Sequence, residues 1–119
     1  MKPKVYIETS VISYLAALPS RDLVVAAHQQ TTHEWWQTWR HDFDLYVSQL
    51  VKAEASRGDP EAAQKRLNIL QKIEFLRTGT DAEVMARSFL NQKVLPKKAA
   101  DDALHIAIAT VNGMEYLLT

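Results

Sequence analysis

The feature that most constrains the fold is a regular alternation of short strand-like segments and longer helix-like segments along the whole chain. Residues 4–7, Lys-Val-Tyr-Ile, are β-branched and aromatic and predict a buried strand. Further strands are predicted at 43–47, 74–76 and 116–118, and helices at 11–17, 23–40, 49–55, 61–72, 81–93 and 96–112. This order favours a mostly parallel sheet with helices on both faces. We therefore expect an α/β fold with three layers, α/β/α, and a short sheet.

Residues that cap helices set several of the predicted boundaries. Thr9 or Ser10 can cap the first helix, because a hydroxyl at this position accepts a hydrogen bond from a free backbone N–H. Ser48 stands in the same relation to the third helix. Thr80 and Glu83 have the spacing of a capping box, which predicts the start of the fifth helix.

The length and composition predict a single domain over residues 1–119. Hydrophobic residues make up 47% of the chain, which is enough to form a core, and charged residues make up 24%, which argues against disorder. The formal net charge is zero, so the chain lacks the basic excess of a general nucleic-acid binder. Any contact with a polyanion must be local or must involve bound cations.

The absence of cysteine excludes disulfides, thiolate zinc sites and cysteine nucleophiles. A chain without cysteine suits a reducing compartment. No run of residues approaches the roughly 20 apolar positions that a membrane-spanning helix needs, and the basic start of the chain is not followed by a signal-peptide pattern. We expect a soluble, cytoplasmic protein without a membrane contact.

Acidic residues occur close to places where a parallel sheet forms its sites. Glu8 directly follows the first predicted strand, and Glu54 lies almost two turns into the helix that follows the second. Asp101 and Asp102 lie in the N-terminal half of the last helix. Ligands of open α/β sheets bind outside the carboxyl ends of the strands. Carboxylates gathered there repel one another unless a cation neutralises them, and hard oxygen ligands select Mg²⁺ or Mn²⁺.

Each acid also has a purely structural interpretation. Glu8 could be a solvated residue at a strand end, and Glu54 could form a surface ion pair with a neighbour such as Arg57. Asp101 and Asp102 could simply stabilise the positive end of the helix dipole. Taken singly, none of these residues identifies a site.

Three short motifs in a fixed order favour the functional interpretation of these acids over the structural one. Residues 5–12, Val-Tyr-Ile-Glu-Thr-Ser-Val-Ile, resemble the opening of PIN domains, in which an acid follows the first strand. Residues 48–54 resemble the second PIN motif, a serine ahead of a helix that carries a glutamate. Residues 102–109 resemble the third motif and are followed at a fitting distance by Gly113 and the segment 116–119. The combination most resembles the VapC-type toxins.

The resemblance implies a Mg²⁺- or Mn²⁺-dependent endoribonuclease that hydrolyses RNA phosphodiester bonds, the toxin of a type II toxin–antitoxin pair. The catalytic, metal-binding acids of the family correspond to Glu8, Glu54 and Asp102 here, with Asp101 as a further candidate metal ligand. The implied partners are an RNA substrate, a cognate antitoxin and a second copy in a homodimer.

Polar and basic residues beside these acids are candidates for supporting roles. Thr9 and Ser10 match the polar residues that follow the first acid of the family, where they can orient it. Lys97 and Lys98 lie just ahead of the paired aspartates and are candidate RNA contacts that steer a phosphate to the site. They are equally compatible with being solvated lysines near a helix end.

Two departures from the family pattern keep a second function open. The family usually has aspartate at the position of Glu8, and it continues beyond the position of Thr119 into another acidic or polar residue. The chain is therefore either a C-terminally trimmed form or lacks a fourth ligand. The alternative is a catalytically impaired PIN-fold module that acts through protein or RNA binding. A phospho-acceptor domain is less consistent, because Ser48 occupies the strand end where a receiver aspartate is needed.

Three tryptophans and one histidine favour structural roles as well. Trp35, Trp36 and Trp39 crowd one predicted helix, so some of them favour core packing and the rest favour a contact with a protein partner. His105 lies within the third motif, where packing or a hydrogen bond is favoured over proton transfer.

Overall fold

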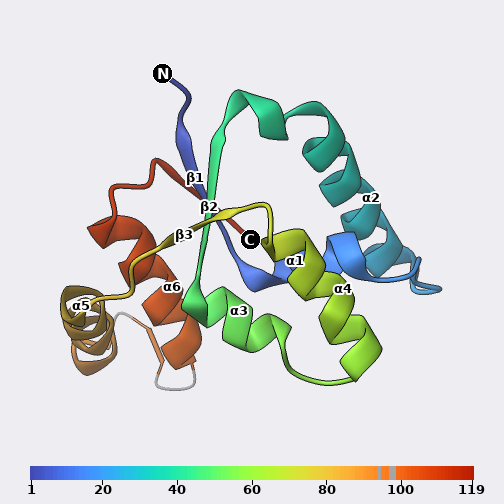
Figure 1. Cartoon of the computed structure of the whole chain (residues 1–119). Coiled ribbons are helices and arrows are strands. Elements are labelled where there is room, and N and C mark those ends of the chain that lie inside the picture. The colour runs from blue at the N-terminus through green and yellow to red at the C-terminus, as the bar shows by residue number, and fades with distance from the viewer. Residues whose placement is uncertain (94, 97–98) are drawn as a thin grey trace.

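The computed structural model of the chain describes residues 1–93, 95–96 and 99–119. A four-stranded parallel sheet forms the middle layer, with α5 and α6 on one side and α1, α2 and α4 on the other (Figure 1). The strands are β1 Lys4–Ile7, β2 Asp44–Ser48, β3 Glu74–Leu76 and β4 Tyr116–Leu118. The helices are α1 Thr9–Ala16, α2 Leu23–Thr38, α3 Gln49–Ala55, α4 Pro60–Leu70, α5 Thr80–Asn91 and α6 Ala100–Val111, with a 3₁₀ turn η1 at Arg40–Asp42. The expected α/β/α fold is confirmed.

The strand order β3-β2-β1-β4 brings the carboxyl ends of β1 and β2 to one edge of the sheet. β1 pairs in parallel with β2 and with β4, so that Val5 is in register with Leu45 on one side and Tyr116 on the other. α1 follows the end of β1 and α3 follows the end of β2. Both helices therefore begin at the edge where α/β proteins form their sites.

The core is centred on β1. Val5, Tyr6 and Ile7 expose 2% of their surface or less, because helices cover both faces of the sheet. α6 buries three alanines together with His105 and Ile108. The main packing partner of α6 is α5, which also buries alanines. Small side chains on both helices let the two backbones approach closely.

Of the three helix caps predicted above, one is observed and two are not. Ser48 caps α3, as predicted, and its Oγ accepts a hydrogen bond from the backbone N–H of Val51. The first helix is capped by Glu8, and not by Thr9 or Ser10, because the carboxylate accepts from the N–H of Ser10. The helical segment therefore begins one residue after the strand-end acid.

The capping box at the fifth helix was a wrong prediction. Thr80 is itself the first residue of α5, and Gly79 occupies the cap position without a side-chain hydrogen bond. The Asp81 carboxylate accepts instead from the N–H of Ala82. A helix that starts one residue earlier leaves the threonine hydroxyl without the geometry that a capping box requires.

Two other helix boundaries differ from the prediction. α6 begins at Ala100, four positions after Pro96, so the paired aspartates lie in its first turn. α2 ends at Thr38 and is followed by η1, which turns the chain into β2. Within the described part of the chain, no helix is long and apolar enough to cross a bilayer.

A matched pair of valines tests the assignment of the core. Val47 on β2 is fully buried, whereas Val84 on α5 is 57% exposed. Val47→Ala should lower the free energy of unfolding by about 2 kcal/mol, because it removes two buried methyl groups and leaves a cavity. Val84→Ala should change it by less than about 0.5 kcal/mol, since exposed helix positions tolerate alanine. Chemical denaturation measures both, and equal losses would contradict the placement of β2 in the core.

Candidate metal centre

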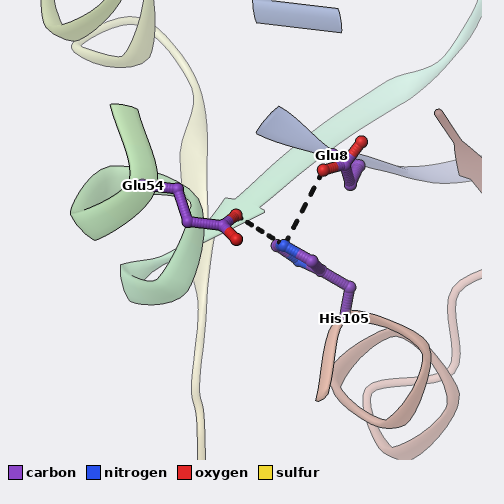
Figure 2. A group of neighbouring side chains, drawn as sticks. All are labelled: Glu8, Glu54 and His105. Atoms are coloured by element: carbon purple, nitrogen blue, oxygen red, sulfur yellow. Dashed lines mark hydrogen bonds and ion pairs between the residues drawn. The ribbon is translucent and has the colours of Figure 1, made fainter. Parts of the chain in front are cut away.

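Three side chains that are far apart in the sequence meet at the carboxyl edge of β1 and β2. Glu8 follows β1, Glu54 lies on α3, and His105 lies on α6. Each offers one ligand atom, and these atoms all lie within 4.8 Å of one another. Figure 2 shows the two carboxylates approaching the edge of the imidazole ring from different elements.

Glu8 is held by the backbone on one side and by Ser10 on the other. Its N–H donates to the carbonyl of Leu118 at 3.0 Å, which ties the end of β1 to the end of β4. Its Oε2 accepts from the backbone N–H of Ser10 at 3.2 Å and from the Ser10 hydroxyl at 2.5 Å. Its Oε1 lies 3.9 Å from Nε2 of His105.

Glu54 is held by residues from two other elements. Its Oε1 accepts from the Thr9 hydroxyl at 2.5 Å and lies 2.7 Å from Nε2 of His105. The side chain is 14% exposed, and that of Glu8 is 18% exposed. Both acids are thus largely shielded, yet water can still reach them.

His105 is buried and has partners on both ring nitrogens. Its side chain is 2% exposed. Nδ1 lies 2.6 Å from the hydroxyl of Tyr6, which in turn lies 2.7 Å from Oγ of Ser48. Burial raises the pKa of Tyr6 well above its ordinary value, and the nearby glutamates act in the same direction against the hydrogen bond from Ser48. The Tyr6 hydroxyl therefore remains protonated and able to donate.

The other predicted site residues lie at different distances from this centre. Thr9 and Ser10 each donate to one of the two glutamates. Asp101 and Asp102 are exposed in the first turn of α6, four and three positions before His105, and neither belongs to the close group of ligand atoms. Residues at these spacings share a side of a helix, so both aspartates lie one turn away from the histidine. Lys97 and Lys98 lie outside the described residues.

Sequence reasoning underestimated His105 and did not consider Tyr6 or Ser48 as part of a network. A signal was present, since His105 is a polar residue in the apolar stretch Ala-Leu-His-Ile-Ala-Ile-Ala. A buried polar group must find a hydrogen-bond partner. The same rule applies to the hydroxyl of a tyrosine in a buried strand. What the sequence could not supply was the identity of these partners, which come from other elements.

The charge balance of the centre favours a cation. Among the described residues, no lysine or arginine forms an ion pair with Glu8 or Glu54. Two carboxylates in a shielded place repel each other, and a divalent cation relieves that repulsion. Carboxylate oxygens are the ligands that Mg²⁺ and Mn²⁺ prefer, so the donor set fits either ion.

A cavity of about 630 Å³ lies elsewhere and is not part of this centre. It opens at the amino ends of β2 and β3, and its lining includes Trp36, Arg40, Lys72 and Glu74. Its position at the opposite edge of the sheet separates it from the glutamates. The acids, and not this cavity, therefore define the candidate site.

Metal-dependent stabilisation tests the centre without reference to any activity. Mn²⁺ at one hundred times its Kd should raise the free energy of unfolding by about 2.7 kcal/mol. Glu54→Gln should remove most of this gain, because the amide keeps the shape but loses the charge. The matched control is Glu74→Gln, which neutralises an exposed acid at the amino end of β3. Thermal unfolding with and without Mn²⁺ measures the effect, and an equal gain in Glu54→Gln would exclude this acid as a ligand.

Two solved structures share the fold of this chain. VapC20 from Mycobacterium tuberculosis, described as a toxin that cleaves the sarcin–ricin loop, has a TM-score of 0.74 at 18% identity, with 96% of this chain and 87% of VapC20 covered. VapBC2 from Rickettsia felis, described as bound to a DNA fragment from its promoter, has a TM-score of 0.68 at 18% identity, with 97% and 86% covered. No protein-family model and no curated protein matches the chain significantly. The chain therefore has the fold of VapC-type PIN domains, in agreement with the motifs of its sequence.

Proposed function

We propose that this protein is a Mg²⁺- or Mn²⁺-dependent endoribonuclease and the toxin of a type II toxin–antitoxin pair. The observation that carries the proposal is the convergence of Glu8 and Glu54 at the carboxyl edge of the sheet, where no described lysine or arginine pairs with them. The VapC fold supports the same function, since one similar structure, VapC20, is described as a toxin that cleaves the sarcin–ricin loop.

The residues divide into those that hold the cation and those that orient them. Glu8 and Glu54 provide the first two ligands, and Asp102, with Asp101 beside it, is the candidate for a further ligand from α6. Thr9 and Ser10 orient the two glutamates through their hydroxyl groups. A divalent cation bound there supplies Lewis-acid chemistry for phosphodiester hydrolysis.

The proposed partners follow from the same function. The substrate is RNA, with Lys97 and Lys98 as its predicted contacts, and the proteins that bind the chain are an antitoxin and a second copy in a homodimer. We place the protein in the cytoplasm, where the RNA substrate is found.

Among the three tryptophans of α2 and its end, Trp35 stacks on Phe43, whereas Trp39 is 55% exposed. The predicted protein contact of this helix therefore depends mainly on Trp39.

Cleavage of RNA in the presence and absence of metal tests the proposal. The protein should cut RNA with Mg²⁺ or Mn²⁺, and EDTA should abolish the cleavage. Asp102→Asn should reduce the rate by roughly a hundredfold, because a carboxamide binds the cation far less well than a carboxylate. Asp101→Asn is the matched control, since it makes the same change one position away on the same helix turn, and a smaller loss is expected.

Three outcomes would count against the proposal or its residue assignment. Equal cleavage in EDTA would exclude a metal-dependent reaction. A larger loss in Asp101→Asn than in Asp102→Asn would exchange the roles of the two aspartates. Metal binding without cleavage of any RNA would favour the impaired module that acts through binding alone.

A further inference from the structure

A chain of hydrogen bonds runs from Ser48 through Tyr6 and His105 to Glu54. We propose that this chain fixes His105 in the tautomer with a proton on Nε2, so that His105 positions Glu54 and is not itself a metal ligand. The inference deepens the proposed function, on which it rests only in the assumption that Glu54 binds a cation. It matters because the histidine lies close enough to both glutamates to be mistaken for a third ligand.

The hydrogen bonds from Ser48 to Glu54 form an unbroken series, and the residues that make them are buried. Ser48 Oγ lies 2.7 Å from Tyr6 Oη, and Tyr6 Oη lies 2.6 Å from His105 Nδ1. His105 Nε2 lies 2.7 Å from Glu54 Oε1. Figure 2 shows the histidine ring extending from α6 towards Glu54. The three residues before the carboxylate each expose 2% of their surface or less.

The number of protons on each group decides which partner donates and which accepts in each of these hydrogen bonds. A carboxylate can only accept, so Nε2 of His105 must carry the proton that it shares with Glu54. The neutral ring then has a lone pair on Nδ1, to which the Tyr6 hydroxyl donates. The oxygen of Tyr6 accepts in turn from the Ser48 hydroxyl, and Ser48 Oγ accepts from the backbone N–H of Val51. Every donor in the chain has an acceptor.

The reversed direction leaves a donor without a partner. If His105 carried protons on both nitrogens, Nδ1 would donate to Tyr6 and Tyr6 would donate to Ser48. The Ser48 hydroxyl would then need another acceptor, and none is present among the described residues. Ser48 is fully buried, so an unsatisfied hydroxyl there is costly. In the described part of the chain, no buried side-chain nitrogen or oxygen lacks a partner.

The consequence is that each glutamate keeps one oxygen available. Glu54 Oε1 already accepts from Thr9 and His105, which leaves Oε2. Glu8 Oε2 already accepts twice from Ser10, which leaves Oε1. His105 has no available lone pair, because Nε2 is protonated and Nδ1 accepts from Tyr6. The histidine thus selects which oxygen of Glu54 faces the cation, and it acts as a positioning residue.

Nitrogen NMR of histidine-labelled, metal-free protein tests the direction of the chain on the wild type itself. We expect the Nε2–H tautomer at His105. Tyr6→Phe removes the donor to Nδ1, so the Nδ1 resonance should move to that of a nitrogen without a hydrogen bond, while Glu54 keeps the proton on Nε2. Tyr116→Phe is the control, because it removes the hydroxyl of an exposed tyrosine on β4, and it should leave both resonances of His105 unchanged. A proton on Nδ1 in the wild-type protein would overturn the proposal.

Pulsed EPR of the Mn²⁺-loaded, ¹⁵N-histidine-labelled protein tests whether His105 is a metal ligand. We expect no coupling from a directly coordinated nitrogen, and a strong coupling from His105 would make it a ligand. His105→Ala should weaken Mn²⁺ binding by roughly tenfold or more, because residues that orient metal ligands have effects of this size. His105→Gln should restore part of the affinity, since its amide can donate to Glu54. Equal losses in both variants would contradict the positioning role.

The proposed function and the hydrogen bonds behind Glu54 are tested by different results. Absence of Mn²⁺ binding would contradict the proposed function, whereas the tautomer of the metal-free protein decides the hydrogen-bond chain by itself.

Discussion

The parallel pairing of β1 with β2 is the constraint on which the candidate site depends. Because both strands end at the same edge, the helices that follow them begin side by side. The first turn of α1 then brings the Thr9 hydroxyl within 2.5 Å of Glu54 on α3. His105 completes the arrangement from α6, which lies against the other face of the sheet. A slip in the register of these strands would separate all of these groups at once.

The sequence was sufficient for the fold but only partly for the site. The alternation of strand and helix patterns predicted all four strands, because a sheet that is buried on both faces reads as short apolar runs. The position of Glu8 was predictable from the end of β1, and that of Glu54 from the helix after β2. The partners of His105 were not, since Tyr6 and Ser48 reach it only through tertiary packing. The wrong cap at Thr9 has the same origin, because its hydroxyl is bonded to Glu54 and not to its own helix.

The centre combines repulsion between acids with a fully paired network behind them. Glu8 and Glu54 carry like charges in a shielded place, which favours a bound cation over an empty site. Behind them, the hydroxyls of Ser48 and Tyr6 and the ring of His105 satisfy one another at the cost of ordering three elements. Such buried polar networks rigidify a structure when every member is paired. The chain has no net charge, so the phosphate binding that we propose depends on a cation held at this site.

The central claim is that Glu8 and Glu54 bind one divalent cation while His105 holds Glu54 in place. Anomalous diffraction from crystals soaked in Mn²⁺ tests it most directly, because the method locates the ion and its ligands together. The account predicts an anomalous peak beside Glu8 and Glu54, with His105 Nε2 still bonded to Glu54 Oε1 and not to the ion. A peak coordinated by His105 Nε2, or one held only by Asp101 and Asp102, would contradict it.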